Sequence, residues 1–137
     1  MKASEIIRKK LEDSSNESAI ITLYNGEEFN VSMGRGDYFV SEKLPFQQVT
    51  FDIFDIVVDF LKSQPNCKAR KGGCRNSKVG EDKCTKDTVM YAIATKYYGK
   101  SEGESSYDPL FVIAAILEWA GIAKNGHGFI KLTKNSY

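Results

Sequence analysis

Three cysteines and a single histidine are the residues with the most distinctive chemistry in this chain. Cys67, Cys74 and Cys84 lie within 18 residues, in a polar, glycine-rich stretch that lacks the apolar side chains for a core of its own. Cysteine thiolates can hold such a stretch by binding Zn²⁺, which takes four ligands in a tetrahedron. His127 is the only histidine available as a fourth ligand. The pattern predicts a structural Cys3His zinc site made by Cys67, Cys74, Cys84 and His127.

Two alternatives to the zinc site stay open. The cysteines are separated by six and then nine residues, whereas paired CxxC spacing is the strong zinc signal. Three free thiols in a loop are the first alternative. A disulfide with one spare thiol is the second, and a reducing compartment disfavours it.

No set of residues predicts an enzyme. The one histidine is far in sequence from any paired serine or cysteine nucleophile, so there is no triad to argue. A catalytic zinc is not favoured either, because no open ligand position or acid–base partner is evident. The sequence therefore predicts a protein that binds rather than catalyses.

Charge is distributed unevenly along the 137 residues, although the formal net charge is only +1. Residues 1–61 sum to −5, residues 62–86 to +6 and residues 87–137 to zero. Near-neutrality argues against a general DNA coat, but the basic segment predicts one charged surface for a partner, nucleic acid included. The candidate contact residues there are Lys68, Arg70, Lys71, Arg75 and Lys78.

An acidic row is the second candidate contact surface. Asp52, Asp55 and Asp59 share one face of a predicted helix at 51–62. Such a row is usually the solvent face of an amphipathic helix. Its functional interpretation is a set of carboxylates that imitates phosphates or meets a basic partner.

The hydrophobic pattern predicts a single α+β domain over residues 1–137. Residues 1–45 should form a helix at 4–13 and a small antiparallel β-meander, with a hairpin at Asn25-Gly26. Residues 46–137 should form three helices and a closing β-hairpin, with a cysteine-rich basic insert at 63–84. The predicted helices span 51–62, about 85–98 and 108–120, and the hairpin strands are 122–123 and 129–132.

The layout of residues 51–133 resembles a winged helix-turn-helix domain. Leu117-Glu118-Trp119-Ala120-Gly121-Ile122 and Gly128-Phe129-Ile130-Lys131-Leu132-Thr133 are similar to its third helix and wing. In DNA-binding members the third helix reads base edges with polar side chains. Here it has no polar residue between Asp108 and Glu118, which predicts burial, or contact with a protein partner or a second copy of the chain.

In its size, its Lys-, Glu-, Asn- and Ser-rich composition and its helix–meander–helix build, the chain resembles small phage-encoded anti-CRISPR proteins. The resemblance implies a stoichiometric inhibitor that contacts a type II RNA-guided nuclease and prevents loading of its target DNA. The alternative is a winged-helix DNA-binding regulator that uses the basic insert and the wing on phosphates. We expect no membrane segment and no signal peptide, and hence a cytoplasmic protein.

Overall fold

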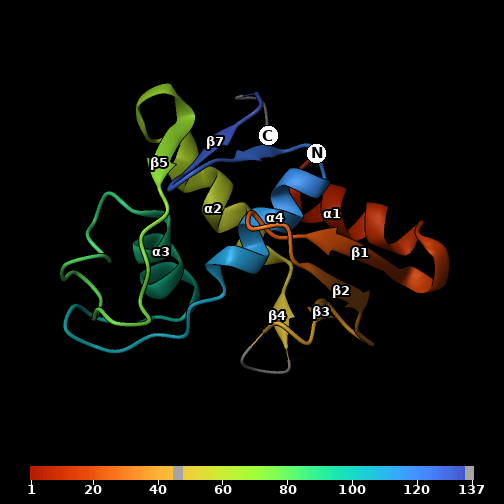
Figure 1. Cartoon of the computed structure of the whole chain (residues 1–137), viewed down its shortest axis with the longest axis horizontal. Coiled ribbons are helices and arrows are strands. Elements are labelled where there is room, and N and C mark those ends of the chain that lie inside the picture. Colours follow the sequence, from red (N-terminus) through yellow and green to blue (C-terminus); the bar gives the residue numbers. More distant parts are fainter. Residues whose placement is uncertain (45–47, 135–137) are drawn as a thin grey trace.

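The computed structural model describes residues 1–44 and 48–134, which form the α+β fold that the sequence predicts (Figure 1). Its helices are α1 (Ala3–Glu12), α2 (Asp52–Lys62), α3 (Val89–Ala92) and α4 (Leu110–Trp119), with short helical turns η1 (Ser15–Glu17), η2 (Pro65–Cys67) and η3 (Ile93–Tyr97). Its strands are β1 (Ser18–Thr22), β2 (Glu28–Met33), β3 (Tyr38–Val40), β4 (Val49–Thr50), β5 (Lys68–Arg70), β6 (Ala123–Asn125) and β7 (Phe129–Leu132). The winged-helix arrangement is not confirmed.

The first sheet has four antiparallel strands in the order β1-β2-β3-β4. The predicted hairpin is confirmed: Ile21 pairs with Phe29, and both side chains enter the core. Gly26 takes a φ of +91° at the turn, where the Gly26 amide donates to the Leu23 carbonyl at 2.9 Å. Tyr24 therefore sits at the tip of the hairpin, where its side chain is exposed.

A second sheet, in the order β5-β7-β6, contains the predicted closing hairpin and one strand that we did not predict. The sequence suggests a loop from 63 to 84, but residues 68–70 add to the edge of β7, with Ala69 opposite Ile130. Three residues with one apolar side chain leave almost no local strand signal. The strand forms because β7 offers a free edge and because Ala69 packs into the core.

Helices α2 and α4 run through the middle of the molecule, between the two sheets (Figure 1). Six of the eleven residues of α2 are buried, as its wide apolar face predicts. Seven of the ten residues of α4 are buried. Packing against β1 and β6 thus covers the apolar helix within the chain itself.

The helix predicted at about 85–98 begins later than expected. We expected a helix from about residue 85, but α3 starts at Val89, with Thr88 as its N-cap. The Thr88 hydroxyl accepts a hydrogen bond from the Tyr91 amide at 3.2 Å. Thr88 has extended backbone angles, and Thr85 and Asp87, which precede it, bind Arg70 through their side chains.

No helix in the described part of the chain is long and apolar enough to cross a membrane.

Candidate functional site

The four predicted zinc ligands do not come together. Cys74 and Cys84 are buried side by side, with 2.8 Å between their Sγ atoms. Cys67 lies in η2 at the start of β5, and His127 is exposed at the β6–β7 turn. Over residues 1–44 and 48–134, no three His, Cys, Asp or Glu side chains form a group that could hold a metal ion. The zinc site stays a prediction.

Burial also sets the protonation of the cysteine pair. Desolvation raises the pKa of the Cys74 thiol well above its ordinary value of 9.0, and the hydrogen bond to Cys84 and the nearby Asp108 carboxylate add to the rise. Desolvation likewise raises the pKa of Cys84. Neighbouring lysines and arginines by themselves would favour the thiolate forms. Burial outweighs them, and both groups are neutral thiols at pH 7.

The acidic row on α2 is partly engaged in holding the fold. Asp55 accepts hydrogen bonds from the Ser4 amide at 2.9 Å and the Ser4 hydroxyl at 2.6 Å, at the start of α1. Asp52 accepts from the Thr50 hydroxyl. Asp59 is exposed. The contacts of Asp55 and Asp52 favour a structural role for this row over phosphate mimicry.

Three of the five predicted basic contact residues gather in one open cleft of about 780 Å³. Arg70 reaches it from the end of β5, whereas Lys71 and Arg75 reach it from the loop that follows. The cleft lining is Tyr24, Arg70, Lys71, Gly72, Gly73, Arg75, Asn76, Asp82, Lys83, Asp108, Phe111, His127 and Gly128. We call it the basic cleft. Lys68 and Lys78 lie outside it, since Lys68 is placed over the Phe129 ring and Lys78 is solvent-exposed.

Lys71 is the most unusual residue of the basic cleft, because its side chain is charged and the residue is only 6 % exposed. Its ammonium nitrogen lies 4.9 Å from the centre of the Tyr24 ring, a cation–π contact. Desolvation lowers its pKa, although Glu118 raises it in part. Among the described residues, no carboxylate forms an ion pair with it. Lys71 is thus a buried cation at the cleft that makes no direct ion pair in the described chain, and Glu118 balances its charge only in part.

Backbone contacts hold Lys71 in this position. Its amide donates to the Gly128 carbonyl at 2.9 Å, and its carbonyl accepts from the Met90 amide at 3.0 Å. Gly72 follows with a φ of +70°, and a Cβ there would lie 2.6 Å from the Thr88 Cβ. Position 72 therefore requires glycine, and the backbone conformation of Gly72 sets the direction of the loop after Lys71.

Aromatic side chains alternate with the cations around the basic cleft. The Arg75 guanidinium lies 5.8 Å from the centre of the Phe111 ring. The His127 ring lies 5.8 Å from the Tyr24 ring, at an angle of 48°. Tyr24 is 53 % exposed and Phe111 is 48 % exposed, both high for large rings. The cleft thus offers flat aromatic faces beside positive charge.

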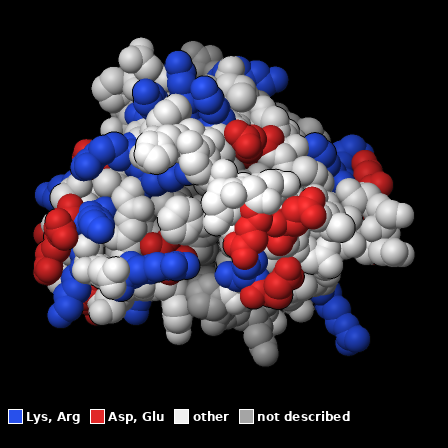
Figure 2. Space-filling model, viewed as in Figure 1, with Lys and Arg blue, Asp and Glu red and all other residues white. Residues whose placement is uncertain are grey.

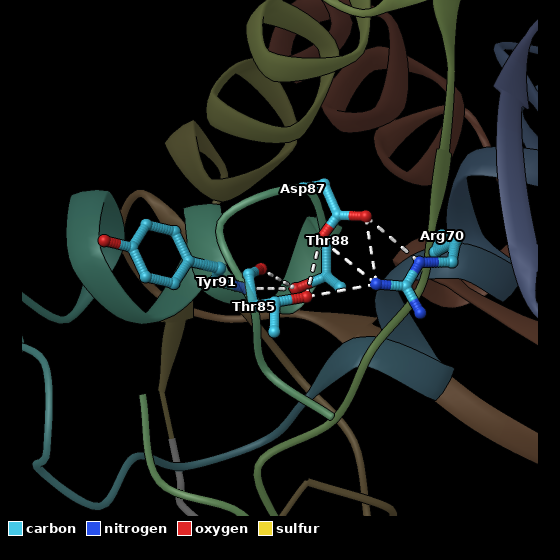
Figure 3. A network of polar contacts seen from close by, with 5 residues as sticks. All are labelled: Arg70, Thr85, Asp87, Thr88 and Tyr91. Carbon is cyan, nitrogen blue, oxygen red and sulfur yellow. Dashed lines mark hydrogen bonds and ion pairs between the residues drawn. The ribbon is translucent and has the colours of Figure 1, made fainter. Parts of the chain in front are cut away.

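A polar network fixes Arg70 at the edge of the basic cleft (Figure 3). Its guanidinium donates to both Asp87 carboxylate oxygens, at 2.9 to 3.1 Å, and to the Thr85 hydroxyl at 3.1 Å. Figure 3 shows Arg70 reaching from the strand toward the turn before α3. The Thr85 hydroxyl and then Arg70 lower the pKa of Asp87. Arg70 is therefore neutralised, which leaves Lys71, Arg75 and Lys83 as the cations of the cleft without an ion pair in the described chain.

Replacing Asp87 with asparagine is expected to destabilise the fold slightly at pH 7. The folded protein lowers the pKa of this carboxyl below 3.8, so its contribution is present at neutral pH and is lost as pH falls through the folded-state pKa. Both side chains are more than half exposed, which limits the effect to less than about 1 kcal/mol. Urea titrations at pH 7 and pH 3 measure it. A difference between wild type and variant that grows at pH 3 would contradict the assignment.

The two exposed aromatic residues of the basic cleft, Tyr24 and Phe111, and its cation Lys83 are not among the contact residues that the sequence predicts. The sequence pattern predicts Tyr24 to be the last residue of a strand. It predicts Phe111 to be one of the apolar residues of a buried helix. Their signal is weak: Tyr24 directly precedes Asn25-Gly26, the predicted turn, and turn residues are often exposed. Phe111 has no comparable signal, because its exposure depends on how α4 meets the loop that carries Arg75.

Comparison of the chain with known protein families, with curated proteins and with solved structures finds no match to any of them.

Proposed function

We propose that this protein is a non-enzymatic binding protein that holds a single nucleic-acid strand in the basic cleft. The observation that carries the proposal is the buried Lys71 ammonium group, which lies against the Tyr24 ring and lacks an ion pair in the described chain. A phosphate group would bring a negative charge into direct contact with this ammonium group, which Glu118 affects only at longer range. Bases next to that phosphate would stack on Tyr24 and Phe111.

A single strand fits the basic cleft better than a duplex does. Aromatic faces bind bases only when the bases are unpaired, whereas duplex DNA presents base edges in its grooves. A winged-helix regulator would read those edges with α4, yet that helix is buried apart from Phe111 and its C-terminal end. The arrangement therefore favours strand binding over the DNA-binding regulator.

The charges around the basic cleft favour a partner in which the nucleic-acid strand is part of a larger complex with protein. Figure 2 shows basic side chains over the upper and left parts of the molecule, with acidic side chains among them at the left edge, and a group of acidic side chains over the β1–β2 hairpin. A general single-strand coat has a continuous positive track, and this chain has a net charge of only +1. An acidic neighbourhood would repel nucleic acid outside the cleft and would suit contact with a basic protein surface.

As the biological setting we propose inhibition of a type II RNA-guided nuclease in the cytosol of a host cell. Such nucleases hold guide RNA and a displaced DNA strand in positively charged channels. An inhibitor that contacts the nuclease and takes up nucleic acid in its basic cleft would block loading of target DNA. This setting follows the resemblance to anti-CRISPR proteins, and the cleft is compatible with it.

A cleavage assay with purified type II nuclease, guide RNA and target DNA tests the setting. We expect cleavage to fall to below about one tenth at a few-fold excess of this protein. Arg75→Glu should restore most of the cleavage, because it places a negative charge beside Phe111 in the basic cleft. Lys96→Glu, on η3 and outside the cleft, is the matched control and should inhibit as wild type does.

A direct binding assay tests strand binding independently of nuclease inhibition. A fluorescent oligonucleotide without secondary structure should bind more tightly than the same sequence as a duplex, with an affinity that falls as salt rises. Strand binding without inhibition of any type II nuclease would contradict the setting alone. Absence of strand binding would contradict the proposed function of the cleft.

A further inference from the structure

The loop that forms one wall of the basic cleft contains two buried cysteines, and their placement has a chemical consequence. Cys74 and Cys84 frame residues 75–83, from which Arg75, Asn76, Asp82 and Lys83 enter the cleft wall. Cys74 is 7 % exposed and Cys84 is fully buried. The third cysteine, Cys67, lies in η2 and is half-buried.

Backbone hydrogen bonds bring this pair together independently of the sulfur atoms. The Gly73 amide donates to the Lys83 carbonyl at 3.0 Å, so the residues just before the two cysteines are paired. The Cys84 carbonyl accepts from the Gly80 amide at 2.9 Å, which fixes the far end of the loop. On the other side, the Asp108 carboxylate accepts from the Cys74 amide at 2.8 Å. The two Sγ atoms then lie 2.8 Å apart.

We propose that Cys74 and Cys84 are a modification site that forms a reversible disulfide and closes the loop wall of the basic cleft. The bond needs little rearrangement, because the backbone already holds both side chains within reach of each other. Among the described cysteines, Cys67 makes no sulfur contact comparable to that between Cys74 and Cys84, because it lies in η2, away from the pair. The disulfide does not depend on what the cleft binds.

A small-molecule disulfide such as oxidised glutathione is the oxidant. The Cys74 sulfur is the more exposed of the pair. Its thiol first gives up its proton to solvent and then attacks one glutathione sulfur, which releases one reduced glutathione. Because burial raises the pKa of Cys74, this step is slow at pH 7 and becomes faster as pH rises. The Cys84 sulfur then attacks the Cys74 sulfur of this mixed disulfide and releases the second. The two cysteines lose two electrons and two protons, and the oxidised glutathione gains them as two thiols.

Peptide mapping of the full-length protein tests the proposal. The chain is equilibrated with equal millimolar concentrations of reduced and oxidised glutathione, quenched with acid, alkylated and digested with trypsin. Trypsin cuts after Lys71, Arg75, Lys83 and Lys86, so the two cysteines fall on separate peptides, 72–75 and 84–86. We expect more than about half of these peptides to be disulfide-linked. Cys67, on peptide 63–68, should instead be alkylated or carry glutathione.

Single variants provide the controls. Cys67→Ser should leave the link between peptides 72–75 and 84–86 intact, whereas Cys74→Ser and Cys84→Ser should each abolish it. The oxidised protein should also melt about 5 °C or more above the reduced protein, because the bond restricts the unfolded chain. This thermal shift should be absent in both Cys74→Ser and Cys84→Ser.

Three results would overturn the proposal. The first is a link that contains Cys67. The second is complete alkylation of all three cysteines after the oxidising incubation. The third is protection from alkylation that a chelator removes, with about one zinc per chain by elemental analysis, which would assign the pair to the predicted metal site instead. None of these readouts uses nucleic acid, so failure here is distinguishable from failure of the proposed function.

Discussion

Replacing Lys71 with methionine is expected to weaken single-strand binding at least about tenfold. Methionine fills a similar volume but removes the buried cation beside Tyr24, and a hydrogen bond to a charged group contributes roughly 1.5–3 kcal/mol. Fluorescence anisotropy with a labelled oligonucleotide at two salt concentrations measures the loss. Lys96→Met is the matched control, because Lys96 is exposed and outside the basic cleft.

The same variant separates a binding role from a structural one. A buried lysine without an ion pair opposes folding, so Lys71→Met should leave the free energy of unfolding unchanged or raise it. A loss of both stability and binding would indicate that Lys71 holds the fold together and would contradict our assignment.

The pH dependence of Lys71 has a definite sign. Because the folded protein lowers the pKa of Lys71 below 10.5, the unfolded chain binds more protons between the two pKa values. The contribution of this residue to the free energy of unfolding therefore becomes more favourable as pH rises through that interval. Strand affinity should fall over the same interval as the ammonium loses its proton, and Lys71→Met should lack this part of the fall.

A second large effect is expected at Ile113, in the middle of α4. Its side chain is fully buried, and Ile113→Ala should lower the free energy of unfolding by about 2–5 kcal/mol through lost burial and the cavity left behind. Urea denaturation followed by circular dichroism measures the change. Strand affinity should be unchanged under conditions in which the variant is still folded.

Phe111, on the same helix, provides a contrasting variant. Its ring is 48 % exposed and faces Arg75, so Phe111→Ala should change stability by less than about 1 kcal/mol. It should nevertheless weaken strand binding by about 1–3 kcal/mol if a base stacks there. Equal destabilisation by the two variants would contradict the placement of α4.

The burial of α4 also predicts whether the protein associates with itself. An apolar helix such as α4 would suit a homodimer, but in this fold its buried residues pack against β1 and β6 of the same chain. The melting temperature of the wild type should therefore not depend on protein concentration. A melting temperature that rises with concentration would indicate that folding and association are coupled.

Sequence patterns predict the elements that depend on neighbouring residues. The Asn25-Gly26 turn, the buried face of α2 and the 123–132 hairpin depend on local periodicity and turn chemistry, and all three are present. Residues 68–70 form a strand only because β7 is beside them, and a local pattern does not contain that information.

The candidate site was only half predictable for the same reason. The +6 charge of residues 62–86 groups Arg70, Lys71 and Arg75, which line one cleft, with Lys68 and Lys78, which lie outside it. It does not show that Lys71 is buried, that Arg70 is neutralised by Asp87, or that Tyr24 completes the cleft. The spacing of the cysteines likewise groups Cys67 with a pair from which the fold separates it.

Most of the chemistry of the basic cleft is carried by turns and loops, with Tyr24 at a hairpin tip, His127 at another, and Lys71 and Arg75 beyond the end of β5. Such positions tolerate substitution far better than core positions do. Ligand preference in this scaffold can therefore diverge rapidly during evolution. Related chains under selection from changing partners should keep the α2–α4 core and differ first at these surface residues.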